Sequence, residues 1–147
     1  MKKFLFLAIM LITLTYCKRD LDCSTPPPEF YLLINKSSEL YKDFLNQKGE
    51  IDRAHIALYK QVNSTKKPYE IKLYYTANND YLVVATQLWF KNDVYTGKTE
   101  TLYLQNATKT YKIEVNGSMK SGECGEYAVT NEIRVDGTKI EVPYLAK

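Results

Sequence analysis

TYKIEV at residues 110–115 and EIRVDGT at residues 132–138 alternate apolar and polar side chains with a period of two. In a β-strand that period places successive side chains on opposite faces of the sheet, so each stretch predicts one face toward a core and one toward water. The second stretch ends in Asp136-Gly137, the pair that a two-residue type I′ hairpin turn favours. These residues predict antiparallel strands joined by tight turns.

The chain before them has the same character from Phe30 onward, with short segments rich in Val, Ile, Tyr and Thr between turn residues. Asn116-Gly117 offers a second turn of the hairpin type. The expected strands are Phe30–Ile34, His55–Lys60, Tyr69–Tyr75, Tyr81–Phe90, Thr99–Leu104, Thr110–Val115, Tyr127–Val135 and Lys139–Val142. They predict an all-β, mainly antiparallel domain, either a single sandwich or a small barrel.

One segment departs from the strand pattern. Leu40, Phe44 and Leu45 follow a serine cap at helical spacing, and Gly49 lies beyond them. We expect one short helix near residues 38–46.

The first residues read as an export signal. Lys2 and Lys3 precede an unbroken apolar and hydroxyl run, and no acidic residue occurs before Asp20. The run is shorter than the roughly 20 apolar residues that span a bilayer. Residues 1–16 are therefore expected to be a signal peptide, which directs the chain out of the cytoplasm.

Residues 14–17, Leu-Thr-Tyr-Cys, resemble a bacterial lipobox, whose cysteine becomes the new N-terminus and carries acyl chains such as palmitate. Two or more acyl chains hold a protein stably on a bilayer, since each buried CH₂ contributes about 0.8 kcal/mol. Lipid attachment at Cys17 would thus anchor the protein to a membrane. The alternative is a plain secreted protein in which Cys17 is a third thiol.

Residues 17–29 are polar and contain Thr25 followed by three prolines, which predicts an extended tether ahead of a single domain at residues 30–147. If Cys17 is acylated, Cys23 and Cys124 form an even pair in an oxidising compartment. We expect a disulfide between them that staples the tether onto the last strands; two thiols are the alternative.

Charge argues against nucleic-acid binding. The chain has 20 basic and 17 acidic residues, a balance of +3, and removing Lys2 and Lys3 with the signal leaves +1. The charges are interspersed and form no phosphate-tracking stripe.

Catalytic and metal-binding patterns are also missing from the sequence. His55 is the only histidine, and neither a C-x-x-C nor a G-x-S-x-G motif occurs. The 17 acidic residues always allow some pair, but no pair is distinguished as a glycosidase couple. We expect no catalytic residues, no metal, no cofactor and no enzymatic activity.

Thirteen tyrosines are the main compositional oddity. They could form a platform of rings for a sugar or a protein partner, or simply be good strand material. The candidate ligand-facing residues are Tyr74, Trp89, Tyr103 and Tyr111, with Tyr75 and Tyr95 in the wider set.

Two further features leave alternatives open. The polar stretch Ser121–Tyr127 is either a recognition loop or a turn held by a disulfide. N-x-S/T sequons occur at Asn35, Asn63, Asn106 and Asn116, and they would be glycan acceptors in a eukaryotic secreted protein.

The chain resembles the small envelope lipoproteins of Bacteroidota-type bacteria. The residues that carry the resemblance are Leu14–Cys17 with Lys18-Arg19-Asp20 behind it, Cys23 with the following prolines and Phe30, and the ending from Cys124-Gly125-x-Tyr127 to Asp136-Gly137. The resemblance implies a lipid-anchored β-domain of the cell envelope, on the outer membrane with its face undecided, and it implies no activity. We expect a binding or structural module with a protein or glycan partner; a secreted or periplasmic inhibitor is the alternative.

Overall fold

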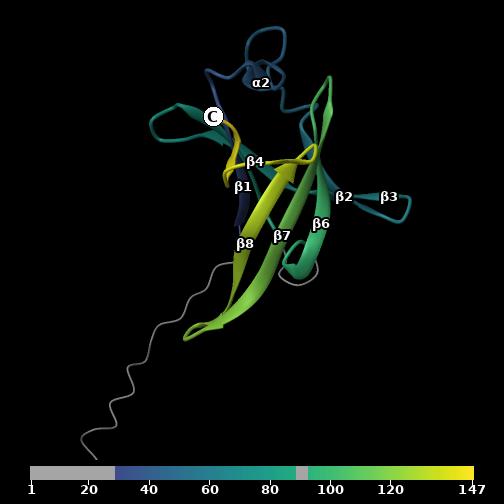
Figure 1. The fold of residues 1–147 in the computed structure, drawn as a ribbon. Helices are drawn as coiled ribbons and strands as arrows, with labels where there is room; N and C mark the ends of the chain where they lie inside the picture. The colour runs from purple at the N-terminus through teal and green to yellow at the C-terminus, as the bar shows by residue number, and fades with distance from the viewer. Residues whose placement is uncertain (1–28, 89–92) are drawn as a thin grey trace, which may run out of the picture.

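The computed structural model describes residues 29–88 and 93–147, which form two β-sheets and one short helix (Figure 1). The predicted signal peptide, Cys17, Cys23 and Trp89 lie outside the described residues. The all-β class is confirmed, and because neither sheet closes on itself, the sandwich is favoured over the small barrel. Within the described residues, no helix has the length and apolar character needed to cross a membrane.

The smaller sheet has four strands in the order β10-β1-β5-β4. Its central pair, β1 (Glu29–Asn35) and β5 (Tyr81–Gln87), is antiparallel along its whole length. On one side β4 (Ile71–Tyr75) pairs antiparallel with β5, and on the other β10 (Tyr144–Ala146) pairs parallel with the end of β1. Glu29, expected in the tether, is thus the first residue of β1.

The larger sheet has six strands in the order β3-β2-β6-β7-β8-β9, and every neighbouring pair is antiparallel. Its strands are β2 (Ala57–Val62), β3 (Thr65–Tyr69), β6 (Thr96–Gln105), β7 (Thr110–Gly122), β8 (Gly125–Val135) and β9 (Thr138–Lys139).

The predicted single strand Tyr69–Tyr75 is wrong, because the chain changes sheets within it. Tyr69 pairs with Leu58 in the larger sheet, whereas Ile71 pairs with Thr86 in the smaller one. Glu70 is the exposed link between the two. The crossover brings the end of β3 next to the start of β4, and residues of both strands line a pocket.

The core lies between the two sheets and is built by the alternation that the sequence predicts. Phe30, Leu32 and Ile34 of β1 are buried there, while their neighbours in sequence lie on the other face. The fully buried side chains of the facing strands include Leu82, Leu102, Leu104, Ile113, Val115 and Ile133.

The helix α2 (Glu39–Lys42) is a single turn, shorter than the predicted 38–46. Ser38 caps it by accepting a hydrogen bond from the backbone N–H of Tyr41 at 3.3 Å. The chain leaves the helix at Asp43, so that Phe44 can enter the core and Leu45 can form an isolated bridge. Packing of Phe44 therefore ends the helix before its sequence pattern does.

Of the two predicted turns, Asp136-Gly137 is confirmed and Asn116-Gly117 is wrong. Asp136 and Gly137 both have positive φ, +49° and +84°, as a type I′ turn requires. Asn116 and Gly117 instead lie inside β7, at an irregularity in its register with β8. A Cβ at Gly117 would come within 2.7 Å of the Tyr95 ring, so the close approach of that ring requires glycine.

Strands β7 and β8 are longer than predicted and form a hairpin that projects beyond the sandwich (Figure 1). Gly122 pairs with Gly125, so Glu123 and Cys124 form the turn. The segment Ser121–Tyr127 is therefore the exposed tip of a hairpin rather than a separate loop. The expected strand Lys139–Val142 contributes only its first residue, to β9.

Candidate ligand-binding face of the four-stranded sheet

The outer face of the smaller sheet carries aromatic side chains on both sides of β5. Because Phe30 and Leu32 point into the core, Tyr31 must lie on the opposite face of β1. The pairing places Tyr31 beside Ala85 of β5, and Val83, two residues away on the same face, beside Tyr74 of β4. Two tyrosines on separate strands thus flank one central strand.

Burial separates the flanking rings from the residues between them. Val83 and Ala85 are only 3% and 0% exposed although they face away from the core, whereas Tyr31 and Tyr74 are 44% and 45% exposed. The side chains of Tyr31 and Tyr74 therefore cover β5 and still offer ring surface to solvent. We call Tyr31, Leu33, Tyr74, Val83 and Ala85 the aromatic face.

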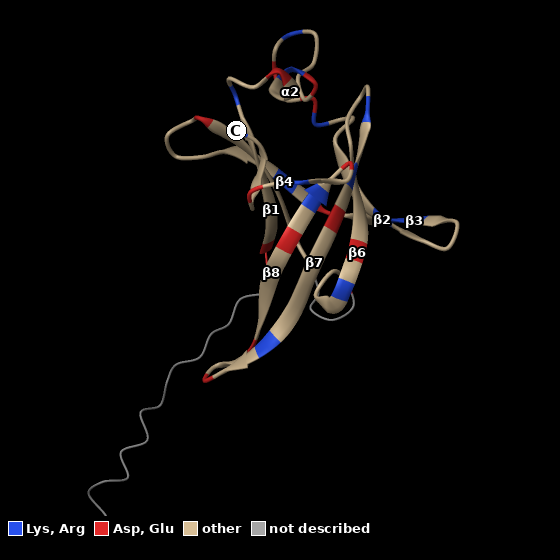
Figure 2. Cartoon of the chain, in the orientation of Figure 1, with Lys and Arg blue, Asp and Glu red and all other residues tan. Residues whose placement is uncertain are grey.

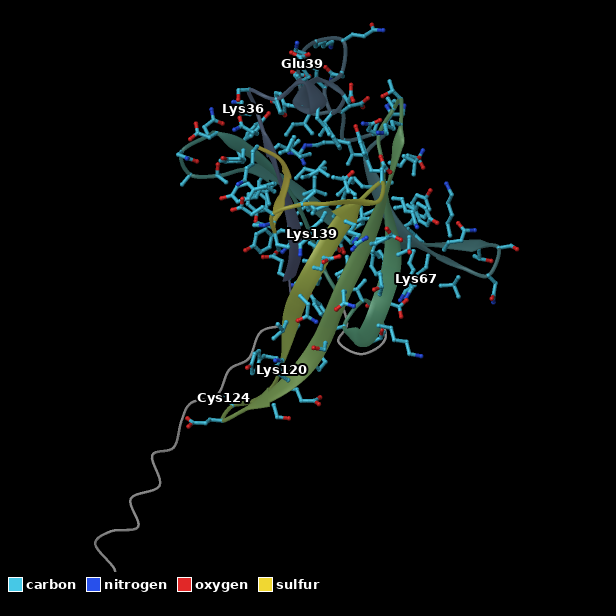
Figure 3. All side chains as sticks on the ribbon, in the orientation of Figure 1. Lys36, Glu39, Lys67, Lys120, Cys124 and Lys139 are labelled. Atoms are coloured by element: carbon cyan, nitrogen blue, oxygen red, sulfur yellow. The ribbon has the colours of Figure 1, made fainter. Side chains whose placement is uncertain are left out.

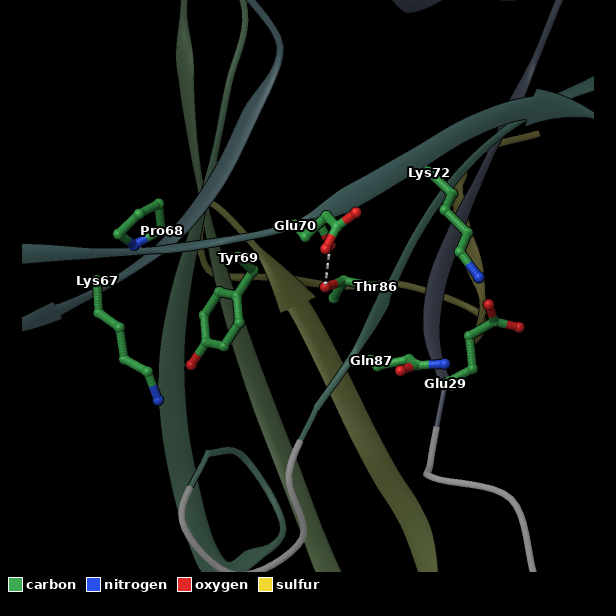
Figure 4. A pocket seen from close by; sticks show the side chains of 8 residues that line it. All are labelled: Glu29, Lys67, Pro68, Tyr69, Glu70, Lys72, Thr86 and Gln87. Carbon is green, nitrogen blue, oxygen red and sulfur yellow. Dashed lines mark hydrogen bonds between the residues drawn. The ribbon is translucent and has the colours of Figure 1, made fainter.

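Next to the aromatic face, at the start of β1, the same surface becomes polar. Glu29 of β1, Gln87 of β5 and Lys72 of β4 line one side of a pocket of about 420 Å³ (Figure 4). Lys67, Pro68, Tyr69 and Glu70 of the crossover line the other side, and the Thr86 hydroxyl donates a 2.7 Å hydrogen bond to the Glu70 carbonyl. We call this hollow the polar pocket.

A buried carboxylate holds the crossover wall of the polar pocket. Asp93 is fully buried, and one of its oxygens accepts hydrogen bonds from the Tyr69 hydroxyl at 2.7 Å and the Lys67 ammonium at 2.8 Å. Burial, followed by the hydrogen bond to Asp93, raises the pKa of Tyr69, so its hydroxyl stays a donor. These contacts give the wall a defined shape.

Charges around the site are balanced in sign. Lys67 and Lys72 face Glu29 and Glu70 around the polar pocket, and Figure 2 shows positive and negative residues interspersed along the strands. Partial burial, with the nearby negative charge of Glu29, raises the pKa of Tyr74 and keeps its phenol neutral. A site of this kind selects by shape and hydrogen bonding more than by net charge.

Of the four predicted ligand-facing residues, the structure describes Tyr74, Tyr103 and Tyr111, and it does not bring these three together. Tyr74 is on the aromatic face, but Tyr103 lies on the outer face of the larger sheet, stacked on Tyr59 with ring centroids 5.3 Å apart. Trp89 lies outside the described residues. The expectation that Tyr111 faces a ligand is wrong. Its side chain is 3% exposed, stacks on Phe44 in the core and donates a hydrogen bond to Asp43.

The wider set of tyrosines is likewise structural. Tyr75 shares a 2.8 Å hydrogen bond with Tyr41, and Tyr95 is buried beneath the bulge of β7. Burial raises the pKa of Tyr95. These phenols satisfy their hydroxyls within the fold rather than offering them to a ligand.

Tyr31 was missed as a candidate. It stands inside the continuous apolar run Phe30–Ile34, which does not show by itself which face is buried. The period of two could have found it, because assigning Phe30, Leu32 and Ile34 to the core places Tyr31 outside.

Other candidate groups are set apart from this face. His55 is exposed and lies 2.8 Å from Asp52, which fits a surface histidine. Cys124 lies at the hairpin tip, beyond Lys120 (Figure 3). In residues 29–88 and 93–147, no three His, Cys, Asp or Glu side chains gather as a metal site would need.

Comparison with known proteins does not add a relative. No family model matches the chain, and no significant similarity links it to a curated protein or to a solved structure.

Proposed function

We propose that this protein is a non-catalytic carbohydrate-binding module of the bacterial cell envelope. The observation that carries the proposal is the pair of half-exposed tyrosines, Tyr31 and Tyr74, on one sheet face that continues into a charge-balanced polar pocket.

A carbohydrate matches both parts of this surface. Sugar rings have apolar C–H faces that pack on the face of a tyrosine ring, and their hydroxyls require donors and acceptors at the rim. The aromatic face supplies the rings, and Glu29, Lys72 and Gln87 supply hydrogen-bonding groups beside it. The balanced charge suits a neutral ligand better than an anion or a cation.

The pocket carboxyls argue for binding without hydrolysis. A glycosidase needs one carboxylic acid whose pKa is raised by burial, so that it can donate a proton near neutral pH. Both Glu29 and Glu70 are exposed to water. The proposed ligand is therefore held and released unchanged.

The envelope location is supported by the sequence. A signal peptide at residues 1–16 and an acylated Cys17 would hold the domain on a membrane, with the outer membrane as the proposed site. Because β1 begins at Glu29, only a short tether would separate the domain from the lipid. Such a module would keep a glycan close to the cell.

The proposal is tested by affinity electrophoresis against a panel of neutral polysaccharides. Tyr31→Ala and Tyr74→Ala should each weaken binding about 2- to 12-fold, the range expected for one aromatic contact of about 0.5–1.5 kcal/mol. Tyr127→Ala is the matched control, because Tyr127 is equally exposed, at 47%, but lies at the hairpin tip. Circular dichroism confirms that each variant is folded.

A second candidate function rests on the projecting β7–β8 hairpin. An exposed hairpin tip such as Ser121–Tyr127 is the kind of element that an inhibitor inserts into an enzyme cleft. Inhibition would be lost with changes at Glu123 or Tyr127 and retained with changes at Tyr31 and Tyr74. Glycan binding predicts the reverse pattern.

A further inference from the structure

The outer face of the smaller sheet carries two more tyrosines beyond the aromatic face. Tyr81 of β5 pairs with Asn35 at the end of β1, and Tyr144 of β10 pairs with Leu33. Leu145, the next residue after Tyr144, is buried in the core. Because side chains alternate between the faces of a sheet and paired residues share a face, Tyr81 and Tyr144 both lie on the outer face.

These two tyrosines contact each other. Their ring centroids lie 5.5 Å apart, with the ring planes tilted by 56°, and both side chains are partly exposed. The Lys147 ammonium lies 5.3 Å from the centroid of the Tyr144 ring. We call Tyr81 and Tyr144 the second tyrosine pair. It offers ring surface with a hydrogen-bond donor beside it.

A second hollow, of about 470 Å³, lies where β1 ends. The backbone N–H of Lys36 donates a 2.9 Å hydrogen bond to the carbonyl of Asp80, which joins its two sides. We call this hollow the far pocket. It is lined by residues from the end of β1 and from the turn between β4 and β5, namely Asn35, Lys36, Ser37, Asn79, Asp80 and Tyr81.

The two pockets and the two tyrosine pairs follow one line along β1. The polar pocket lies at Glu29, Tyr31 and Tyr74 come next, and the second tyrosine pair leads to the far pocket at Asn35. Figure 1 shows the C-terminal strand, which carries Tyr144, beside the end of β1. The six residue steps from Glu29 to Asn35 (35 − 29) span about 20 Å in an extended strand.

A chain of sugar rings matches this line in length and in chemistry. Each ring of an extended chain advances by roughly the spacing between neighbouring strands, about 5 Å, so about four rings fit the line. Glu29 and Lys72 balance in charge at one end. Lys36 and Asp80 balance at the other. A chain with a net charge would meet a like charge at each end, whereas a neutral chain would not.

We propose that the outer face of the smaller sheet binds a linear neutral polysaccharide along β1, over a stretch of about four sugar units. The proposal rests on the carbohydrate binding proposed above. Tyr31 and Tyr74, at 44% and 45% exposed, form the primary subsite. Tyr81 and Tyr144 form a second subsite, which a disaccharide on the primary subsite does not reach.

The dependence of affinity on chain length tests the proposal. The probes are neutral oligosaccharides of two, four and six units from the cello-, manno-, xylo- and laminari-series, titrated calorimetrically into the full chain. In the series that binds, affinity should rise about 10-fold from two to four units, because the second tyrosine pair adds ring contacts. It should change little from four to six.

Variants of the second subsite separate it from the primary one. Tyr144→Ala should weaken binding of the four-unit probe about 2- to 12-fold and leave binding of the two-unit probe unchanged. Tyr31→Ala should weaken both. Tyr144→Phe keeps the ring and should keep the affinity. Tyr103→Ala is the matched control, because Tyr103 also packs on another tyrosine but lies on the larger sheet.

The outcomes distinguish this proposal from the proposed function. Equal affinity for two and six units, or a four-unit affinity that Tyr144→Ala leaves unchanged, would overturn the second subsite while carbohydrate binding at Tyr31 and Tyr74 stands. An equal loss in Tyr103→Ala and Tyr144→Ala would also overturn it. Failure of all four series to bind would contradict carbohydrate binding itself.

Discussion

Gly117 lies directly against the ring of Tyr95, so that a Cβ at position 117 would come within 2.7 Å of the ring carbon Cδ1. This contact explains why an Asn-Gly pair stands inside a strand. Gly117→Ala should lower the free energy of unfolding by about 1–3 kcal/mol, because the buried ring must shift. Urea denaturation measures the change.

Gly122→Ala is the matched control for that substitution. Its Cβ would meet the ring of Tyr127 at 3.2 Å, but that ring is exposed at the hairpin tip and can move aside. Its effect should stay well below that of Gly117→Ala. Equal effects would contradict the role given to Tyr95.

Ionisation of the Tyr111 phenol should lower the free energy of unfolding at alkaline pH. Burial, together with the hydrogen bond to Asp43, raises the pKa of Tyr111 to about 12, whereas an unfolded tyrosine ionises near 10. The unfolded state therefore loses the Tyr111 proton first. The contribution of Tyr111 to the free energy of unfolding is complete below about pH 10 and is lost as the pH rises to 12. The loss is on the order of 2 kcal/mol for this one group.

The urea midpoint at pH 9 and at pH 11 checks this prediction. Tyr111→Phe should show a smaller decline between the two values than the unmutated protein. An identical decline would mean that the Tyr111 phenol does not contribute.

Sequon use can be predicted from side-chain exposure. Asn63 is exposed in the two-residue turn between β2 and β3, with φ at +54°. The side-chain nitrogen of Asn106 is buried, that of Asn116 donates a hydrogen bond to Thr99, and the side chain of Asn35 accepts two hydrogen bonds from Ser37. If a eukaryotic host exports the protein, folded molecules should carry glycan at Asn63 and none at Asn106. Intact glycopeptide mass spectrometry would show it, and an occupied Asn106 in folded protein would contradict the packing described here.

The strand pattern could be predicted because local chemistry and tertiary structure agree along most of the chain. Alternation identified β7 and β8, and Asp136-Gly137 formed the turn that its dihedral angles favour. Asn116-Gly117 has the same local preference, but the ring of Tyr95, which lies in the loop just before β6, decides its conformation. No local signal in the sequence reports that contact.

The candidate site was harder to predict because tyrosine suits both sides of a sheet. Tyr111 and Tyr74 are chemically alike, yet one faces Phe44 in the core and the other flanks Val83 on an outer face. Which face is buried follows from sheet order, and sheet order depends on the crossover at Glu70. The sequence shows no break there.

Packing of sugar rings on Tyr31 and Tyr74 can be observed directly by nuclear magnetic resonance of the protein with a bound polysaccharide from the affinity panel. We expect intermolecular contacts from sugar C–H protons to the ring protons of Tyr31 and Tyr74, with none to Tyr127. Contacts confined to the hairpin tip at Ser121–Tyr127, or a panel in which no polysaccharide binds, would contradict it.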